Sequence, residues 1–351
     1  RVIEKQGYEV EWPFDLDQLN ASIRCQVDEA PACHGIDLRD LSFITIDGES
    51  ARDFDDAVLC QFDGEHYHLD VAIADVSHWV KPGTALDQAA RERGNSVYLP
   101  DRVLPMLPEI LSNDVCSLRP DQERFAFVCK MTFDQEGNLQ DSQFVTGTIC
   151  SAARLTYQEA SNHLMGIRPL SSRISDKVRH NLELLHVLAQ KLTDRRLKSG
   201  GVEFSFPETQ TTYRDDGWLS DIKHIDRPVA TLIIEECMLA ANVCAAQCLQ
   251  KSLPVAIYRI HGAPDSDRIF ELRQVLSLFG VNMNGSSDPS ARDLSECLAE
   301  IRQASCPFET LQTLVLRCMK QASYSSNCAP HFALGFERYT HFTSPIRRYS
   351  D

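Results

Sequence analysis

The sequence predicts an α+β fold, with mixed β-sheets in the first half of the chain and a helix-rich second half. Residues 67–76 (YHLDVAIADV) and 124–133 (RFAFVCKMTF) alternate in the manner of β-strands. After residue 170, apolar residues recur at helical spacing. The chain has 351 residues, of which 43% are hydrophobic, and this is enough to bury one large core.

The N-terminal residues 1–40 predict a lead-in segment rather than part of the main fold. Pro13 and Pro31 favour extended backbone there, and a short helix is expected near Asp17–Cys25. The chain shows no internal repeat and no low-complexity tract. We therefore expect a single α+β domain over residues 41–351.

Strands and helices then follow in two blocks. Buried or alternating strands are expected at residues 41–46, 57–59, 67–76, 124–133 and 144–149, with a turn at Gly137-Asn138. Ser175 is a suitable N-cap for a helix that ends at Gly200-Gly201. Further helices are expected at about 229–251, 266–279, 291–304 and 308–322.

Residues 44–58 (ITIDGESARDFDDAV) concentrate negative charge. Five acidic side chains face one arginine in this stretch, and four of them are aspartates: Asp47, Asp53, Asp55 and Asp56. Crowded carboxylates raise one another's pKa unless a cation is present. Oxygen ligands at this density suit Mg²⁺, or Mn²⁺, and a pair of such ions is a common device for cutting phosphodiesters.

Most Asp-rich stretches are solvated turns or helix caps, so the flanking residues matter. Residues 41–46 and 57–59 are apolar on either side, and both predict buried strands. A carboxylate run held between two buried strands is poorly placed to be a mobile surface loop. The run also lacks the ligand order of an EF-hand calcium loop.

Several further motifs follow in a fixed order: VAIADVSHWVKPGT, RGNSVYLP, MLPEILSNDVCSLRP, ARLTY, IIEECMLAANVCAA and HFTSPIRRYSD. Together with the acidic stretch they resemble the RNase II/RNase R (RNB) family of 3′→5′ exoribonucleases, and the ARDFDDAV wording is closer to the RNase R branch. The resemblance implies an RNB-type catalytic domain over 41–351 that hydrolyses single-stranded RNA to nucleoside 5′-monophosphates with Mg²⁺.

The resemblance also implies roles for individual residues. Apart from the resemblance, we expect Asp47 and Asp56 to hold one ion, and Asp53 and Asp55 to serve the second ion and the attacking water. Arg347 matches the arginine that lies at the scissile phosphate, with Arg348 as its neighbour. Tyr98 and Phe204 match aromatic residues that clamp the 3′ nucleotides, Tyr157 matches a residue near the end of the RNA, and Phe206 competes with Phe204 for its role.

The net charge of −15 is unusual for a chain that binds RNA. Either a single channel carries the basic residues, or RNA-binding modules lie outside this chain. The sequence opens without Met and stops directly after SPIRRYS. We therefore expect flanking OB-fold RNA-binding domains, and a continuation of the catalytic domain, beyond this segment. A monomer in the cytoplasm is expected, where the 13 scattered cysteines would be reduced core thiols.

Three questions remain open on the sequence alone. Glu235 and Glu236 interrupt the apolar stretch 228–250, and they either form salt bridges or face the active site. The histidines form no recognisable ligand pair, so His78, His261, His331 and His341 are assigned structural roles. Two other functions compete with the exoribonuclease: a catalytically silent RNA-binding relative, and a different two-metal phosphoesterase.

Overall fold

The computed structural model describes residues 7, 10–30, 33–99, 102–206, 208–214, 218–225, 227–304 and 306–351. Parts of the predicted lead-in, at residues 1–6, 8–9 and 31–32, lie outside this set, as does Pro100 of the RGNSVYLP motif. The predicted helix of the lead-in is present as α2 (Leu16–Glu29), and it is capped by the Asp15 carboxylate.

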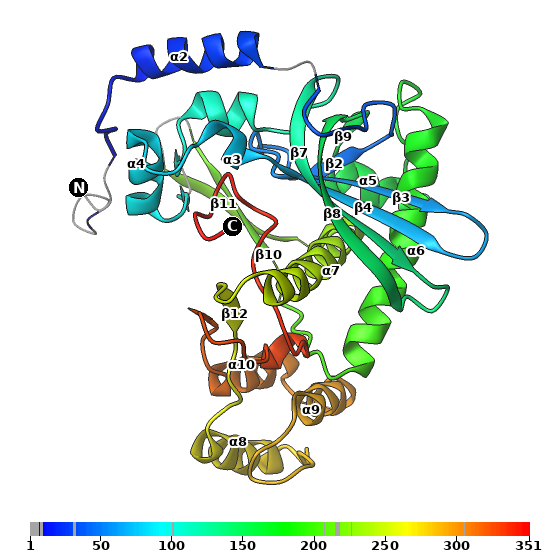
Figure 1. Cartoon of the computed structure of the whole chain (residues 1–351). Coiled ribbons are helices and arrows are strands. Elements are labelled where there is room, and N and C mark those ends of the chain that lie inside the picture. The colour runs from blue at the N-terminus through cyan, green and yellow to red at the C-terminus, as the bar shows by residue number, and fades with distance from the viewer. Residues whose placement is uncertain are drawn as a thin grey trace.

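A mixed β-sheet forms the centre of the molecule (Figure 1). Within the described residues seven strands form one sheet in the order β1–β8–β7–β4–β3–β2–β9. The pairs β1·β8 and β2·β9 are parallel, whereas the other neighbours are antiparallel. The strand bounds are β1 (Ile36–Asp37), β2 (Ile44–Asp47), β3 (Asp56–Phe62), β4 (Tyr67–Ala74), β7 (Glu123–Phe133), β8 (Leu139–Cys150) and β9 (Ala153–Thr156). The predicted mixed sheet is therefore confirmed.

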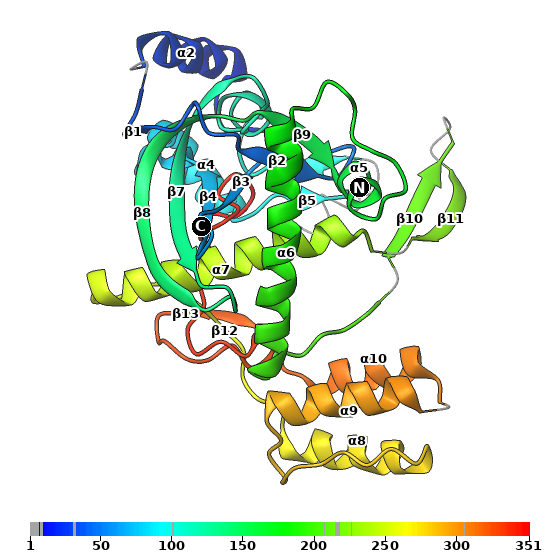
Figure 2. The ribbon, with the colours of Figure 1, turned by 90° about the vertical axis from the view of Figure 1, so that its right-hand side faces the viewer.

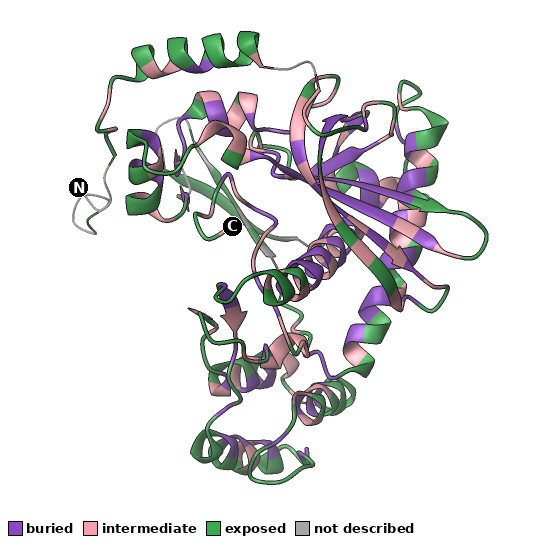
Figure 3. Cartoon of the chain, in the orientation of Figure 1, coloured by how far each residue is buried: buried purple, intermediate pink, exposed green. Residues whose placement is uncertain are grey.

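Helices cover both faces of this sheet. One face packs against α5, α6 and α7, and its core contains Val58 and Val71 from the strands. The other face packs against α2, α4 and a one-turn π-helix, with Leu59 and Ala72 in its core. The central strands are therefore buried on both sides, as Figure 3 shows. The bounds are α4 (Ala85–Arg93), the π-helix η1 (Leu111–Val115), α5 (Tyr157–Leu164), α6 (Asp176–Lys198) and α7 (Val229–Ser252).

A smaller helical lobe follows in the second half of the chain (Figure 2). It has its own apolar cluster, built from α8 (Ser266–Leu278), α9 (Ala291–Gln303) and α10 (Phe308–Cys318). The helix expected over 308–322 ends at Cys318, so that boundary was wrong. Met319 takes extended backbone, and residues Ser323–Ser325 form β13, which pairs with β12 (Tyr258–Ile260).

Shorter elements complete the fold. Helix α3 (Val76–Trp79) follows β4, and the hairpin β5 (Val97–Tyr98) and β6 (Val103–Leu104) follows α4. A second hairpin, β10 (Glu208–Tyr213) and β11 (Leu219–Ile225), projects from the body (Figure 2). The short 3₁₀ helix η2 (Phe332–Leu334) precedes the last residues, which return to the middle of the molecule (Figure 1).

Helix α7 crosses the molecule as a core element. Among the described residues it alone is long and apolar enough to span a membrane, but 61% of its most apolar window is buried inside the protein. It contacts α6 and α5 on one side and the sheet on the other. The two glutamates in this helix differ in environment, because Glu236 is 3% exposed whereas the side chain of Glu235 is 40% exposed.

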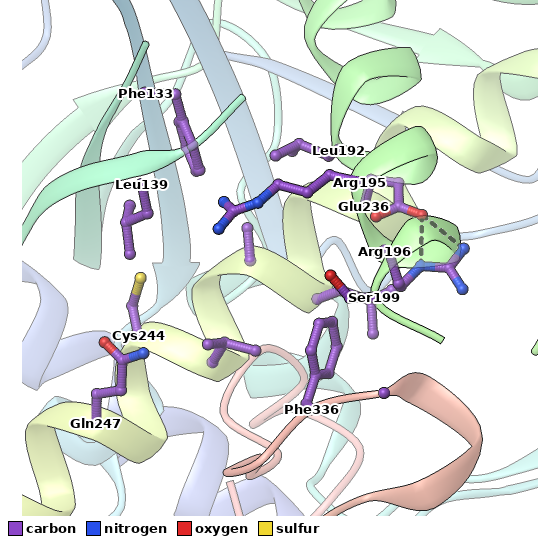
Figure 4. A pocket seen from close by; sticks show the side chains of 14 residues that line it. Phe133, Leu139, Leu192, Arg195, Arg196, Ser199, Glu236, Cys244, Gln247 and Phe336 are labelled. Atoms are coloured by element: carbon purple, nitrogen blue, oxygen red, sulfur yellow. Dashed lines mark hydrogen bonds and ion pairs between the residues drawn. The ribbon is translucent and has the colours of Figure 1, made fainter. Parts of the chain in front are cut away.

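Both glutamates form ion pairs, which answers the question left open above. Arg196 of α6 donates to Glu236 from Nε and Nη2 at 2.9 and 2.7 Å, and the Thr193 hydroxyl adds a third hydrogen bond. This buried pair lines a pocket of about 230 Å³ between α6, α7 and the β7–β8 hairpin (Figure 4). Glu235 pairs with Arg227 at 2.6 Å in a partly exposed position.

Removing the Glu236 charge should therefore destabilise the fold far more than removing that of Glu235. Glu236→Gln leaves the Arg196 guanidinium buried without its counter-ion, and such losses amount to about 3–5 kcal/mol. Glu235→Gln removes an exposed pair that is worth at most about 1 kcal/mol. Urea unfolding of the two variants measures the difference. Equal losses of unfolding free energy would contradict this assignment.

Candidate active site

The acidic stretch joins the ends of two neighbouring strands. Asp47 is the last residue of β2, and Asp56 is the first residue of β3. Because β2 and β3 are antiparallel neighbours, the end of one lies beside the start of the other. Asp53 and Asp55 lie in the connection between them. The fold thus gathers all four predicted aspartates where β2 ends and β3 begins.

The connection itself is fixed by buried contacts. Phe54, between Asp53 and Asp55, is 7% exposed and packs in the core. The Ser117 hydroxyl accepts from the Phe54 N–H at 2.9 Å and donates to the Arg52 carbonyl at 2.8 Å. Arg154 donates to the carbonyls of Gly48 and Glu49 at 2.7 and 3.0 Å. The stretch is therefore not a mobile loop.

Asp55 is the most buried of the four aspartates, and the C-terminal segment bonds to its side chain. It is 4% exposed, and its Oδ1 accepts from the Ile346 N–H at 2.8 Å. The Arg347 Nε lies 3.4 Å from its Oδ2. On the backbone side, its carbonyl accepts from the Ala74 N–H at 2.9 Å, which ties it to the end of β4.

The two neighbouring arginines have different partners. Arg347 contacts Asp55 and donates to the Ser344 hydroxyl at 3.2 Å, and about half of its side chain stays exposed. Arg348 donates twice to the buried carboxylate of Asp351, at 3.0 and 2.7 Å. The structure therefore brings Arg347, and not Arg348, to the aspartates.

Burial and mutual repulsion shift the titration of this cluster. Burial and the charge of Asp56 raise the pKa of Asp47 to about 8, against an opposing effect of Arg154. Burial raises the pKa of Asp55 to about 7, which Arg347 opposes. Burial and the Asp55 charge raise the pKa of Asp56 to about 7. Carboxylates that are costly to ionise by themselves are a suitable set for a divalent cation, and their oxygen atoms suit Mg²⁺ or Mn²⁺.

Two of the three predicted aromatic residues lie at this cluster. The Tyr98 hydroxyl donates to Asp53 Oδ2 at 2.8 Å, and the residue is 51% exposed. Tyr157 is the first residue of α5, directly after β9. Burial, together with the charges of Asp56 and Asp47, raises its pKa. Each tyrosine therefore places an aromatic ring beside the carboxylates.

Phe204 lies elsewhere. It packs partly buried against the helical lobe, and Gln312 of α10 bonds both the N–H and the carbonyl of the next residue, Ser205. Its ring stacks on Phe206 with centroids 6.0 Å apart, and Phe206 is 39% exposed. Its described contacts do not include the four aspartates. The stacked pair presents Phe206 more openly than Phe204.

Sequence reasoning missed several residues that hold the site in place. Ser117 lies in the motif MLPEILSNDVCSLRP and Arg154 in ARLTY, so both occurred in blocks already singled out. The Ile346 N–H carries no side-chain signal, so no pattern could reveal it. Three of the histidines do make structural hydrogen bonds: His261 with Lys320 and Ala333, His331 with Leu334, and His341 with Tyr324.

The chain is similar in sequence to bacterial ribonucleases. It is 42% identical over 341 residues to the Ribonuclease R of Escherichia coli (strain K12), an alignment that covers 97% of this chain and 42% of the relative. This chain therefore spans about two fifths of that protein's length.

The structure is similar to solved ribonucleases as well. Mycoplasma genitalium RNase R, solved in complex with ribose-methylated single-stranded RNA, matches with a TM-score of 0.90 at 28% identity, covering 97% of this chain and 53% of that one. Yeast Ssd1, described as a pseudonuclease, shares the fold with a TM-score of 0.71 at 19% identity, over 90% of this chain and 39% of its own.

The fold alone thus occurs with and without nuclease activity, and the site residues must carry the functional argument. The family assignment does not depend on that argument. The family model of the RNB domain matches residues 36–351, nearly the whole chain. Together with the 42% identity to Ribonuclease R and the TM-score of 0.90 to a solved RNase R, this shows that the chain belongs to the RNB domain family.

Proposed function

We propose that this chain is the catalytic core of a Mg²⁺-dependent exoribonuclease that hydrolyses single-stranded RNA from the 3′ end and releases nucleoside 5′-monophosphates. The contact of Arg347 with Asp55 carries the proposal, because it joins a cation from the C-terminal segment to a buried carboxylate near the start of the chain. Similarity to ribonucleases over 97% of the chain supports it.

Asp47, Asp53, Asp55 and Asp56 would hold the divalent ions, Mg²⁺ or Mn²⁺. When bound, such ions polarise a phosphoryl oxygen and lower the pKa of a bound water. The Tyr98 hydroxyl fixes the orientation of the Asp53 carboxylate through its 2.8 Å hydrogen bond. The Ile346 N–H does the same for Asp55, so little rearrangement is needed when substrate arrives.

Arg347 supplies the fixed positive charge beside the scissile phosphate. Its planar guanidinium can donate two parallel hydrogen bonds to phosphate oxygens, which a lysine cannot do. Asp55 and Ser344 hold the side chain, yet about half of it remains exposed to a ligand. A charge that is oriented before the reaction stabilises the negative charge that develops on the phosphate.

Aromatic side chains would hold the RNA. The exposed Tyr98 ring lies beside the carboxylates and can stack on a base, and Tyr157 lies next to the same charges. Stacking tolerates any base, so it suits an enzyme that acts along a whole strand. We keep Phe204 as a proposed RNA contact at a distance from the aspartates, with its exposed stacking partner Phe206 as the alternative.

The proposal includes partners outside this chain. A net charge of −15 leaves few basic side chains for the RNA backbone. Flanking OB-fold domains, attached to a catalytic domain that extends over 41–351 and beyond, would supply the remaining grip. We propose that the protein acts as a monomer in the cytoplasm, and that residues 1–40 serve as the linker to such a domain.

The proposal has two rivals: a silent RNA-binding relative, and a phosphoesterase for small substrates. The chain has all four aspartates and Arg347, and these side chains lie close enough to interact electrostatically. A catalytically silent protein has no chemical reason to keep this set together. One experiment separates the three functions. Single-stranded RNA labelled at its 5′ end is incubated with the protein and Mg²⁺, and the products are resolved on a gel.

We expect progressive shortening from the 3′ end, and no cleavage by Asp55→Asn protein that still binds RNA. A metal ligand acts on the reaction, whereas stacking and phosphate contacts hold the substrate. Binding without cleavage by the unmodified protein would favour the silent relative. Neither binding nor cleavage would favour the small-substrate phosphoesterase.

Arg347→Ala should lower kcat by about 10²–10³-fold, the loss typical of removing one preorganised charge stabiliser. Arg348→Ala provides the matched control, because Arg348 pairs with Asp351 and not with the aspartates. Single-turnover cleavage rates measure both variants. A larger catalytic defect in Arg348→Ala would show that the wrong arginine has been assigned.

Mg²⁺ should stabilise the protein more at a pH of about 8 than at about 5.5. An unfolded aspartate titrates near a pKa of about 3.9. Because the pKa values of Asp47, Asp55 and Asp56 are raised to about 8, 7 and 7, the folded chain holds extra protons between these limits. Without a cation, the free energy of unfolding therefore falls as pH rises through this window, and a bound cation reverses the loss.

The measurement is the Tm with and without MgCl₂ at both pH values, with Asp56→Asn as the comparison. The variant should show a smaller increment of Tm at high pH. Identical increments at the two pH values would contradict a cation site at these carboxylates.

A further inference from the structure

A second cluster of metal-ligating side chains lies away from the four aspartates. His34, Asp75 and His78 each offer one ligand atom, and these atoms all lie within 4.8 Å of one another. His34 Nε2 is already 3.7 Å from Asp75 Oδ2. Among the described residues, no other group of three or more histidine, cysteine or acidic side chains comes together in this way.

Two segments far apart in the sequence bring these residues together, and each is anchored by its backbone. The His34 N–H donates to Thr148 Oγ1 at 2.7 Å, and the chain then enters β1, which pairs with β8. At the next residue, Gly35, a Cβ atom would lie 2.1 Å from the Thr146 carbonyl oxygen, so the lead-in lies directly on β8. The Asp75 N–H donates to the Phe125 carbonyl of β7 at 3.1 Å.

The Asp75 carboxylate is already oriented as a ligand. Its Oδ1 accepts from the Ser77 hydroxyl at 2.7 Å and from the His78 N–H at 3.1 Å. These bonds leave Oδ2 directed toward His34. Asp75 is only 9% exposed, and outer hydrogen bonds of this kind fix the ligand groups of known metal sites.

Aromatic rings form the wall of the cluster. The His34 and His78 rings meet edge to face with centroids 4.8 Å apart, and both pack on Phe125, at 5.2 and 4.7 Å. Trp79 also stacks on Phe125, with ring centroids 5.8 Å apart. These aromatic contacts involve both imidazole rings, whose nitrogen atoms form the polar part of the cluster.

We propose that His34, Asp75 and His78 form a binding site for a divalent transition-metal ion of the Zn²⁺ class. Two imidazoles and one carboxylate suit Zn²⁺ and its neighbours, whereas the all-oxygen aspartate cluster suits Mg²⁺. Three protein ligands leave one tetrahedral position for water. The ligand atoms must draw closer on binding, and the His34 side chain, one third exposed, has room to turn.

The site's place in the fold indicates a structural role. It would join the segment before β1 to the end of β4 and the start of α3, elements that no other described ion pair links at this point. Ala74, the residue before Asp75, donates its N–H to the carbonyl of Asp55. A metal ion here would thus reinforce the strand end that positions an active-site carboxylate, without touching substrate.

The test uses Zn²⁺ as the probe, titrated against a chromophoric chelator in buffer with excess Mg²⁺ to occupy the aspartate cluster. His34→Phe and His78→Phe keep an aromatic ring on Phe125 but remove the nitrogen ligand. His180→Phe is the matched control. The His180 side chain is 71% exposed on α6, and this variant keeps the same cysteines, which could also bind Zn²⁺. Tm with and without Zn²⁺ gives a second readout that does not depend on activity.

Zn²⁺ affinity should fall at least about tenfold in both ligand variants, the smallest loss seen even for outer-shell changes. The control should keep the affinity of the unmodified protein, and the Zn²⁺-dependent rise in Tm should vanish in the ligand variants alone. Equal Zn²⁺ affinity in all four proteins would overturn the proposal, and so would the absence of binding. If His78→Phe fails to fold, His34→Phe, at the more exposed position, decides the result by itself.

Discussion

The site depends on the cost of burying like charges at the junction of two strands. Burial and mutual repulsion make the carboxylates of Asp47, Asp55 and Asp56 hard to ionise. Groups outside the junction must therefore offset the negative charge of these carboxylates, and the C-terminal segment supplies such groups. Ile346 contributes a backbone N–H and Arg347 a positive charge, and both meet Asp55. A bound divalent cation would complete that compensation.

The rest of the fold holds this junction rigid. The sheet is covered on both faces, so β2, β3 and β4 cannot shift without disturbing two cores. Phe54 anchors the acidic stretch in one of those cores, and Ser117 bonds the backbone on either side of Asp53. A charge cluster attached to loosely packed strands could relax by exposing its carboxylates to water. Here it cannot, and this is why the carboxylates stay ready for a cation.

The chain also separates two kinds of cation chemistry in space. The aspartate junction offers only oxygen, whereas His34, Asp75 and His78 offer mostly nitrogen. The two groups are linked through the backbone, since the Ala74 N–H donates to the Asp55 carbonyl and Asp75 is the next residue. Under the proposed function, a net charge of −15 leaves the attraction of RNA to Arg347 at short range and to the proposed flanking domains at long range.

Local patterns in the sequence were sufficient for the α+β class, for the longest strands and helices and for the acidic stretch, because periodicity and charge density are properties of neighbouring residues. Tertiary structure decided the rest. The last helix ends at Cys318 since residues 323–325 pair with β12, and Glu236 pairs with Arg196 from another helix. The choice of Arg347 over Arg348, the placement of Phe204 in the helical lobe and the meeting of His34 with His78 all depend on contacts between distant segments. No local pattern records such contacts, because the fold alone brings those residues within bonding distance.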